Sequence, residues 1–182
     1  SRIVRKLALL SGKDIPLITG SDLTNRLFRE GLEPNEEITI VGCTDAKIDR
    51  LRALFPKLAI HHYNPPMGFI TSQAEIEKVL HFIEENATRL IFLAVGSPQQ
   101  ELIAYRASDR IEHGLCICVG ASIDFLVNPK LRAPRWMQSV SLEWLYRLIL
   151  EPRRLWRRYL VEDMAIVPIF LRDLLRRQSK FT

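Results

Sequence analysis

The chain has 182 residues, enough for a domain with a hydrophobic core, and its 47% hydrophobic content argues against global disorder. The formal net charge is +5, and the basic excess lies at one end. Residues 131–182 hold 11 Lys and Arg against 5 Asp and Glu, whereas residues 1–130 hold 15 against 16. Such a basic tail favours an anionic surface or an anionic substrate. The longest apolar run near the end, Met164–Leu171, is shorter than the ~20 residues of a membrane-spanning helix.

The start of the chain has no pattern of a secretory signal peptide. Its first residues already have the pattern of an amphipathic helix, so we expect the native amino terminus to lie upstream of Ser1. Apolar spacing and turn residues then predict alternating helices and strands. The expected helices are 2–10, 22–29, a segment with Ile48, Leu51 and Leu54 on one face, 72–87 and 98–112. The expected strands are 37–42, 58–63, 89–95 and 115–119, the last two buried as in a parallel sheet.

Strand and helix alternate four times, which predicts an α/β fold: a Rossmann-like, mostly parallel sheet with helices on both faces. After Asp124 the pattern is helical only. We therefore predict an α/β core over residues 1–131 and a basic helical appendage over residues 132–182.

The cysteines and the paired histidines are not predicted to bind metal. Cys43, Cys116 and Cys118 lie in apolar strand-like runs, which indicates reduced thiols in the core of a cytosolic protein. His61 and His62 are adjacent in a predicted strand, so their side chains point to opposite faces. The sequence also lacks a DxD pair for a metal-bound diphosphate. These features favour a metal-independent site without a cofactor.

Three predicted strands end in glycine or small residues, at Val41-Gly42, Val95-Gly96-Ser97 and Val119-Gly120-Ala121. In open α/β sheets ligands bind at the carboxyl ends of strands, and such loops let backbone N–H groups approach an anion. No GxGxxG or GxxxxGK[ST] motif is present, so neither a dinucleotide fingerprint nor a P-loop is supported.

The middle loop predicts a helix start with Ser97 as the N-cap, Pro98 in the first position and Gln100 in a capping box. Two interpretations stay open: a well-capped helix and nothing more, or a helix whose Gln99, Gln100 or Glu101 faces a sugar hydroxyl. Asp124, after the third loop, is either polar lining of the site or a helix cap.

The tail contains a basic amphipathic helix. At ~100° per residue from Pro152, the arginines and the apolar residues separate onto two faces. The basic face holds Arg153, Arg154, Arg157 and Arg158, and the other holds Leu155, Trp156, Tyr159 and Leu160. A solvated charged face, a nucleic-acid-binding surface and a surface for anionic lipid headgroups or a lipid diphosphate are all consistent with this pattern.

Seven segments in order resemble the WecG/TagA/CpsF family of glycosyltransferases. They are Thr19-Gly-Ser-Asp-Leu23, Pro65-Pro-Met-Gly-Phe69, Gly96-Ser-Pro-Gln-Gln-Glu101, Val119-Gly-Ala-Ser-Ile-Asp-Phe125, Arg132-Ala-Pro-Arg-Trp-Met137, Glu143-Trp-Leu-Tyr-Arg147 and Glu151-Pro-Arg-Arg-Leu-Trp-Arg-Arg158. The resemblance covers essentially the whole chain.

The resemblance implies an inverting, metal-independent enzyme that moves a sugar, of the N-acetylmannosamine type or its uronate, from UDP to an undecaprenyl-diphosphate-linked saccharide. It implies a peripheral protein on the inner face of the cell membrane that makes teichoic acid or other surface polysaccharides, with no nucleic-acid partner; self-association is left open. The expected catalytic residues are Gln100 and Asp124. The expected donor-binding residues are Thr19, Gly20, Gly42, Gly96, Ser97, Gln100, Glu101, Gly120 and Ala121. The expected acceptor-diphosphate and membrane residues are Arg132, Arg135, Arg147, Arg153, Arg154, Arg157 and Arg158.

This sequence departs from the family pattern in two places. The Asp-Gly segment that carries the family's proposed base is expected upstream of Ser1, and Leu17 stands where members often carry Arg. Asp22 and Asp124 are then the weaker base candidates within the chain. The alternative function is a non-catalytic adaptor that binds UDP-sugars or an acidic membrane.

Overall fold

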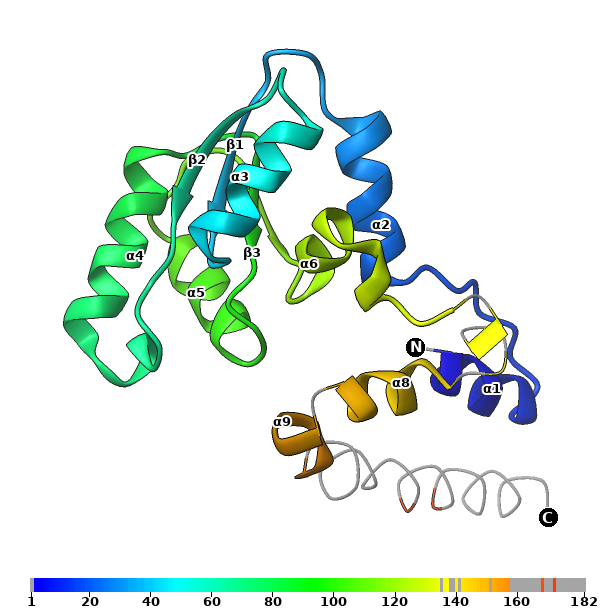
Figure 1. Cartoon of the computed structure of the whole chain (residues 1–182). Helices are drawn as coiled ribbons and strands as arrows, with labels where there is room; N and C mark the ends of the chain where they lie inside the picture. The colour runs from blue at the N-terminus through cyan, green and yellow to red at the C-terminus, as the bar shows by residue number, and fades with distance from the viewer. Residues whose placement is uncertain are drawn as a thin grey trace. The chain divides into compact units, whose positions relative to one another are not determined.

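The computed structural model of the chain describes residues 2–134, 136–137, 140, 142–150, 152–157, 168 and 172 (Figure 1). The chain divides into two compact units. We call Thr19–Leu131 the α/β unit, and Ser1–Ile18 together with Arg132–Thr182 the helical unit.

The α/β unit is built on a sheet of four parallel strands in the order β2-β1-β3-β4. The strands are β1 (Glu37–Val41), β2 (Ala59–Tyr63), β3 (Leu90–Leu93) and β4 (Leu115–Cys118). Helices connect successive strands, as parallel pairing requires. The predicted α/β, Rossmann-like fold is therefore confirmed.

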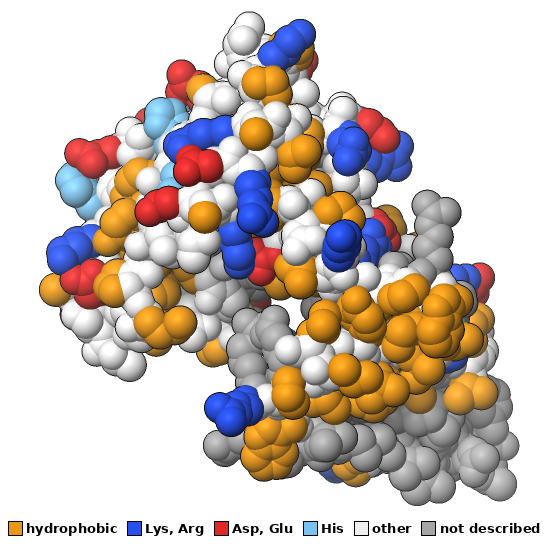
Figure 2. Space-filling model, viewed as in Figure 1, with side chains coloured by type: hydrophobic (Ala, Val, Ile, Leu, Met, Phe, Trp, Pro, Cys, Tyr) orange, Lys and Arg blue, Asp and Glu red, His pale blue; other side chains and the backbone are white. Residues whose placement is uncertain are grey.

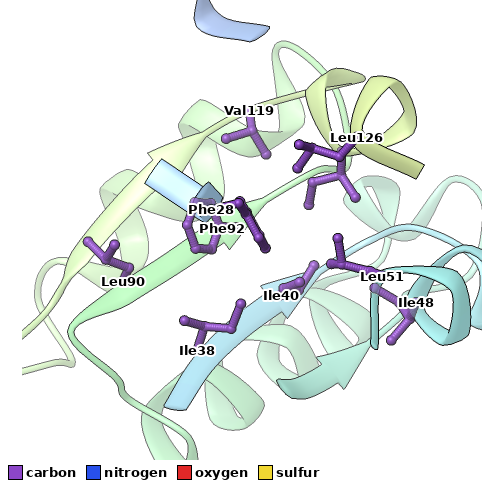
Figure 3. Close-up of a cluster of buried hydrophobic side chains, with 10 residues drawn as sticks. Phe28, Ile38, Ile40, Ile48, Leu51, Leu90, Phe92, Val119 and Leu126 are labelled. Atoms are coloured by element: carbon purple, nitrogen blue, oxygen red, sulfur yellow. The ribbon is translucent and has the colours of Figure 1, made fainter. Parts of the chain in front are cut away.

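Both faces of the sheet are apolar, and each is covered by helices. Ile38, Ile40 and Phe92 face one layer, where Phe92 meets Phe28 with ring centroids 4.9 Å apart (Figure 3). Ile91 and Leu93 face the other layer. This alternation explains why β1 and β3 read as nearly continuous apolar runs: central strands of a parallel sheet have no solvent-facing side.

The helices fall into two layers around this sheet. The first layer contains α2 (Gly20–Arg26), its π-helical continuation Leu27–Gly31, α3 (Asp45–Leu54) and α6 (Ser122–Val127). The second contains α4 (Gln73–Glu85) and α5 (Gln99–Ala107). Short 3₁₀ turns at Phe69–Thr71 and Pro129–Leu131 complete the α/β unit.

The fourth strand is less buried than predicted. In the described part of the chain β4 pairs only with β3, so it forms an edge of the sheet. Leu115 is 60% exposed and Cys118 is exposed, while Cys43 and Cys116 are half-buried. The prediction that all three cysteines are core residues was therefore wrong for Cys118, because an apolar sequence does not reveal whether a strand is central or at an edge.

The α5 helix is shorter than the predicted 98–112. It ends at Ala107, where a turn closes with the Arg110 N–H donating to the Ala107 carbonyl at 2.9 Å.

The helical unit contains α1 (Arg2–Leu10), α8 (Glu143–Leu150) and α9 (Pro152–Arg157). The predicted first helix is confirmed, and Gly12, with φ of +73°, follows its end as a C-terminal glycine commonly does. Within the residues that the structure describes, no helix is both long and apolar enough to span a bilayer.

Candidate active site

The candidate active site lies at the carboxyl edge of the sheet, where the strand order reverses. The chain leaves β1 through α3 toward β2 on one side, and β3 and β4 lie on the other side of β1. The carboxyl ends of β1 and β3 are therefore neighbours across the topological switch point, where open α/β sheets bind their ligands. Two of the three predicted glycine loops follow these two strands.

The loops after β1 and β3 are in direct contact. The Ala94 N–H donates to the Val41 carbonyl at 2.8 Å. A Cβ on Gly42 would lie 2.8 Å from the Ala94 carbonyl carbon, and Gly42 has φ of +96°. Both the contact and the backbone conformation therefore require glycine at this position. This glycine lets the two loops come together at the switch point.

His62 holds the first loop from the end of β2. Its Nε2 lies 3.0 Å from the Gly42 carbonyl oxygen and 3.3 Å from the Cys43 carbonyl oxygen. Because a carbonyl oxygen only accepts hydrogen bonds, the His62 Nε2–H is the donor. His61 instead lies with Nε2 3.2 Å from Glu37 Oε2. The two histidines therefore bind different partners, as their strand geometry predicts. The structural role of His62 was not foreseen, because it depends on which loop β2 lies beside.

Gln100 joins the second loop to the third. Its side chain is buried, with 7% of the residue exposed, and its Oε1 accepts from the Gly120 N–H at 2.9 Å. Its Nε2 donates to Glu101 Oε1 at 2.9 Å. The amide thus fixes the start of α5 to the loop that follows β4.

The predicted capping box at Ser97 was wrong. The helix begins at Gln99, with Pro98 as the N-cap and no side-chain cap hydrogen bond. Pro98 has a non-helical ψ of 4°, and the Gln100 amide is held by Gly120 instead of turning back to the helix start. Sequence spacing could not reveal this competing partner, which comes from another loop.

Asp124 forms an ion pair that the sequence did not indicate. Lys47 Nζ, from the first turns of α3, lies 2.7 Å from Asp124 Oδ1 on α6. The pair is half-buried, with 38% of the lysine side chain and 24% of the aspartate side chain exposed. The Lys47 ammonium thus holds the Asp124 carboxylate beside the loop after β1. Because the two residues are far apart in sequence, only the packing of α3 on α6 brings them together.

Cys43 lies beside this pair and is not a nucleophile at neutral pH. Burial, followed by the negative charge of Asp124, raises the pKa of the Cys43 thiol to about 11. The thiolate is the reactive form of cysteine. Cys43 is therefore a protonated neighbour of the site.

Thr19 and Gly20 belong to the start of α2. Thr19 is the N-cap: its Oγ1 accepts from the Asp22 N–H at 3.1 Å and donates to Asp22 Oδ2 at 2.6 Å. The predicted capping turn is confirmed, although the helix begins at Gly20 and not at Asp22. The turn thus caps a helix that packs against α6, the helix that follows the Gly120 loop. Its donor-binding role remains a prediction.

The predicted tail arginines are described unequally. Arg132 is half-buried and Arg153, in α9, is exposed. The backbone positions of Arg147 in α8 and of Arg154 and Arg157 in α9 are described, but not their side chains. Arg135 and Arg158 lie outside the described residues.

A hollow lies at the opposite edge of the sheet and is not a candidate for the donor. It is lined by Gly31, Glu33, Pro34, Asn35, Glu36 and Arg89, at the amino ends of β1 and β3. Its one positive side chain is already paired, since Arg89 Nε donates to Glu36 Oε1 at 2.7 Å, and Glu33 adds a negative charge that does not suit a diphosphate. Within the described ranges, no three His, Cys, Asp or Glu side chains are grouped as metal ligands would be.

Comparison with protein families shows which family this chain matches. The model described as "Glycosyl transferase WecG/TagA/CpsF family" matches residues 1–180, and so includes both compact units. This is the family that the seven ordered sequence segments resemble.

Proposed function

Because this chain belongs to the WecG/TagA/CpsF family of glycosyl transferases, we propose that it moves a sugar from UDP to an undecaprenyl-diphosphate-linked saccharide. The product serves cell-surface polysaccharide or teichoic acid synthesis. The match over 180 residues is the observation that carries this proposal.

The donor is assigned to the switch-point edge of the α/β unit. There the loops at Gly42, Gly96 and Gly120 follow three neighbouring strands of one parallel sheet. Their backbone N–H groups suit the UDP diphosphate, since oriented peptide dipoles at strand and helix ends favour anions. Thr19, Gly20, Ser97, Glu101 and Ala121 complete the assigned donor residues.

Gln100 acts in this proposal by positioning. Its bonds to Gly120 and Glu101 fix the relative place of two donor loops, so that Glu101 is presented to the sugar or ribose hydroxyls. Groups that folding has already placed lower the activation barrier, because their loss of entropy has occurred before the reaction begins.

The reaction is a displacement with inversion. The acceptor hydroxyl oxygen bonds to the anomeric carbon as the bond from that carbon to the UDP phosphate oxygen breaks, and the hydroxyl proton leaves to a base. Asp124, which lies 2.7 Å from Lys47 Nζ, is a candidate proton acceptor among the described residues, as is Asp22. Arg147, Arg154 and Arg157 stabilise diphosphate charge, the usual task of arginine forks.

A transfer assay tests the proposal. The chain is incubated with a panel of UDP-sugars and a short-chain lipid-diphosphate saccharide, with and without EDTA. We expect transfer of an N-acetylmannosamine-type sugar with inverted configuration and no loss in EDTA. Asp124→Asn should lower kcat, whereas the exposed Asp109→Asn serves as the matched control. Absence of transfer from every donor, by this chain and by a version extended at its amino terminus, contradicts the proposal.

The alternative function is a non-catalytic adaptor. It predicts UDP-sugar binding by calorimetry, or binding to acidic membranes, without transfer to any acceptor. The two functions therefore differ in one measured quantity, the amount of glycosylated lipid.

A further inference from the structure

Exposed apolar side chains are concentrated in the helical unit. Of the 17 large hydrophobic side chains that are exposed in the described part of the chain, ten belong to this unit. The unit nevertheless supplies fewer than a third of the described residues. Figure 2 shows hydrophobic side chains gathered in a broad patch on one face of it. An exposed apolar patch of this kind marks an interaction surface.

Part of this surface comes from α1 and the residues after it, outside the basic tail. Leu10 is 74% exposed and Ile18 is 71% exposed, and Val4, Leu9 and Ile15 are exposed as well. None of the described side chains of α1, Val4–Leu10, is buried. The helix therefore leaves much of its apolar area uncovered in the folded unit.

The charges of α1 are all positive. At ~100° per residue, Arg5 and Lys6 lie within one arc, whereas Val4, Leu7, Ala8 and Leu10 lie in the remaining arc. The following residues add Lys13, and Asp14 is already paired with Arg5 at 3.2 Å. An amphipathic helix with a basic polar face matches anionic headgroups with its charges and acyl chains with its apolar side.

We propose that α1 and the residues up to Ile18 form a second contact with an anionic lipid bilayer, beside the contact assigned to the tail. The helix lies in the interface without spanning it, because its nine residues are far fewer than the ~20 needed to cross. Trp136 and Trp156 are exposed in the same unit, and tryptophan favours the membrane–water interface. This inference rests on the proposed membrane role of the tail.

Vesicle sedimentation of the full chain tests this contact. Vesicles of phosphatidylcholine with and without phosphatidylglycerol are compared for the parent chain, Leu10→Glu, Ile18→Glu and Lys6→Glu/Lys13→Glu. The matched control is Leu54→Glu in α3, which is 53% exposed but belongs to the α/β unit. Thermal unfolding of each variant checks that an exposed substitution leaves the fold intact.

We expect Leu10→Glu and Ile18→Glu each to weaken binding about tenfold, and the control to bind as the parent does. The lysine variant should reduce mainly the additional binding to anionic vesicles. If Trp156→Glu abolishes binding while Leu10→Glu and Ile18→Glu do not change it, this inference is wrong and the tail contact stands. If the parent binds neither kind of vesicle, both membrane contacts are wrong. The transfer assay reports separately on the proposed enzyme activity.

Discussion

The two units of this chain use apolar residues in opposite ways. In the α/β unit, Ile38, Ile40 and Phe92 are fully buried between a sheet and its helices. In the helical unit, Leu10, Ile18 and Trp156 are exposed. The first arrangement stabilises a fold, because burial removes apolar area from water. The second leaves apolar side chains available to contact another surface, such as a lipid bilayer.

The difference shows that the hydrophobic content of a segment does not reveal whether its apolar side chains are buried in the core or exposed at the surface. Both units contain amphipathic helices, such as α4 and α1, but α4 places Ile76, Val79 and Leu80 against the sheet. No such layer buries α1 in the part of the chain that the structure describes. Stability is therefore expected to depend on the α/β unit, and acceptor and membrane binding on the helical unit. The following variants test this division.

The largest effect is expected on transfer activity, when two arginines of the helical unit are replaced. Arg154→Glu/Arg157→Glu should lower transfer by about 100-fold or more, because reversing two diphosphate-binding charges removes electrostatic stabilisation. The urea midpoint of the α/β unit should stay unchanged. The matched control, Arg29→Glu/Arg50→Glu, reverses two exposed charges of the α/β unit and should keep its activity. Equal activity of the two double variants would contradict the proposed role.

The switch-point contact should give the largest effect on stability. Gly42→Ala should lower the free energy of unfolding by about 3 kcal/mol, from a strained positive φ and a Cβ against Ala94. Gly68→Ala is the control, since φ is +78° but no atom lies within 4 Å of the new Cβ. That variant should lose only about 1 kcal/mol. Urea unfolding measures both; equal losses would show that the contact with Ala94 does not matter.

Loss of the loop-to-loop hydrogen bond should have a moderate effect. Gln100→Ala should destabilise the chain by about 1 kcal/mol, because the Gly120 N–H loses its 2.9 Å bond to Gln100 and keeps only the longer one, 3.3 Å, to the Leu93 carbonyl. It should also raise the KM for the UDP-sugar. The neighbouring half-buried Gln99 forms no such bond among the described contacts, and Gln99→Ala should change stability by less than about 0.5 kcal/mol. A higher KM with unchanged stability would favour direct contact between Gln100 and the donor.

The smallest effect concerns acid stability. The hydrogen bond from Arg89 lowers the pKa of Glu36 in the folded chain. Its stabilisation is therefore present above the unfolded pKa, near 4.5, and is lost as the pH falls through the lower folded pKa. Because Arg89 is mostly exposed, the contribution should be under about 1 kcal/mol.

Glu36→Gln tests the ion pair between Glu36 and Arg89. The control is Glu84→Gln, which replaces an exposed carboxylate of α4. Glu36→Gln should reduce stability at pH 7 and flatten its dependence on pH in the acid range. Urea unfolding at pH 7 and at pH 3 measures the difference. If Glu84→Gln changes the stability at pH 7 and pH 3 as much as Glu36→Gln does, Arg89 has no specific role in acid stability.

Local patterns predicted the elements of the fold well. The apolar runs at Ile38 and Ile91 gave central strands, and the Thr19 turn capped α2 as expected. The predicted strand at Leu115 is present as β4, but the prediction that it is buried was wrong, since it lies at an edge of the sheet. Hydrophobic period and turn residues are local properties, whereas the position of a strand in a sheet depends on its neighbours.

The sequence by itself determined the order of strands and helices, the excess of positive charge near the end, and the ordered motifs that place the chain in its family. Only the tertiary structure decided which residues meet: Lys47 with Asp124, Gln100 with Gly120, and His62 with the loop after β1. It also decided that none of the described side chains of α1 is buried. The physical reason is that charge and periodicity belong to neighbouring residues, whereas ion pairs, loop contacts and exposure depend on parts of the chain that only folding brings together.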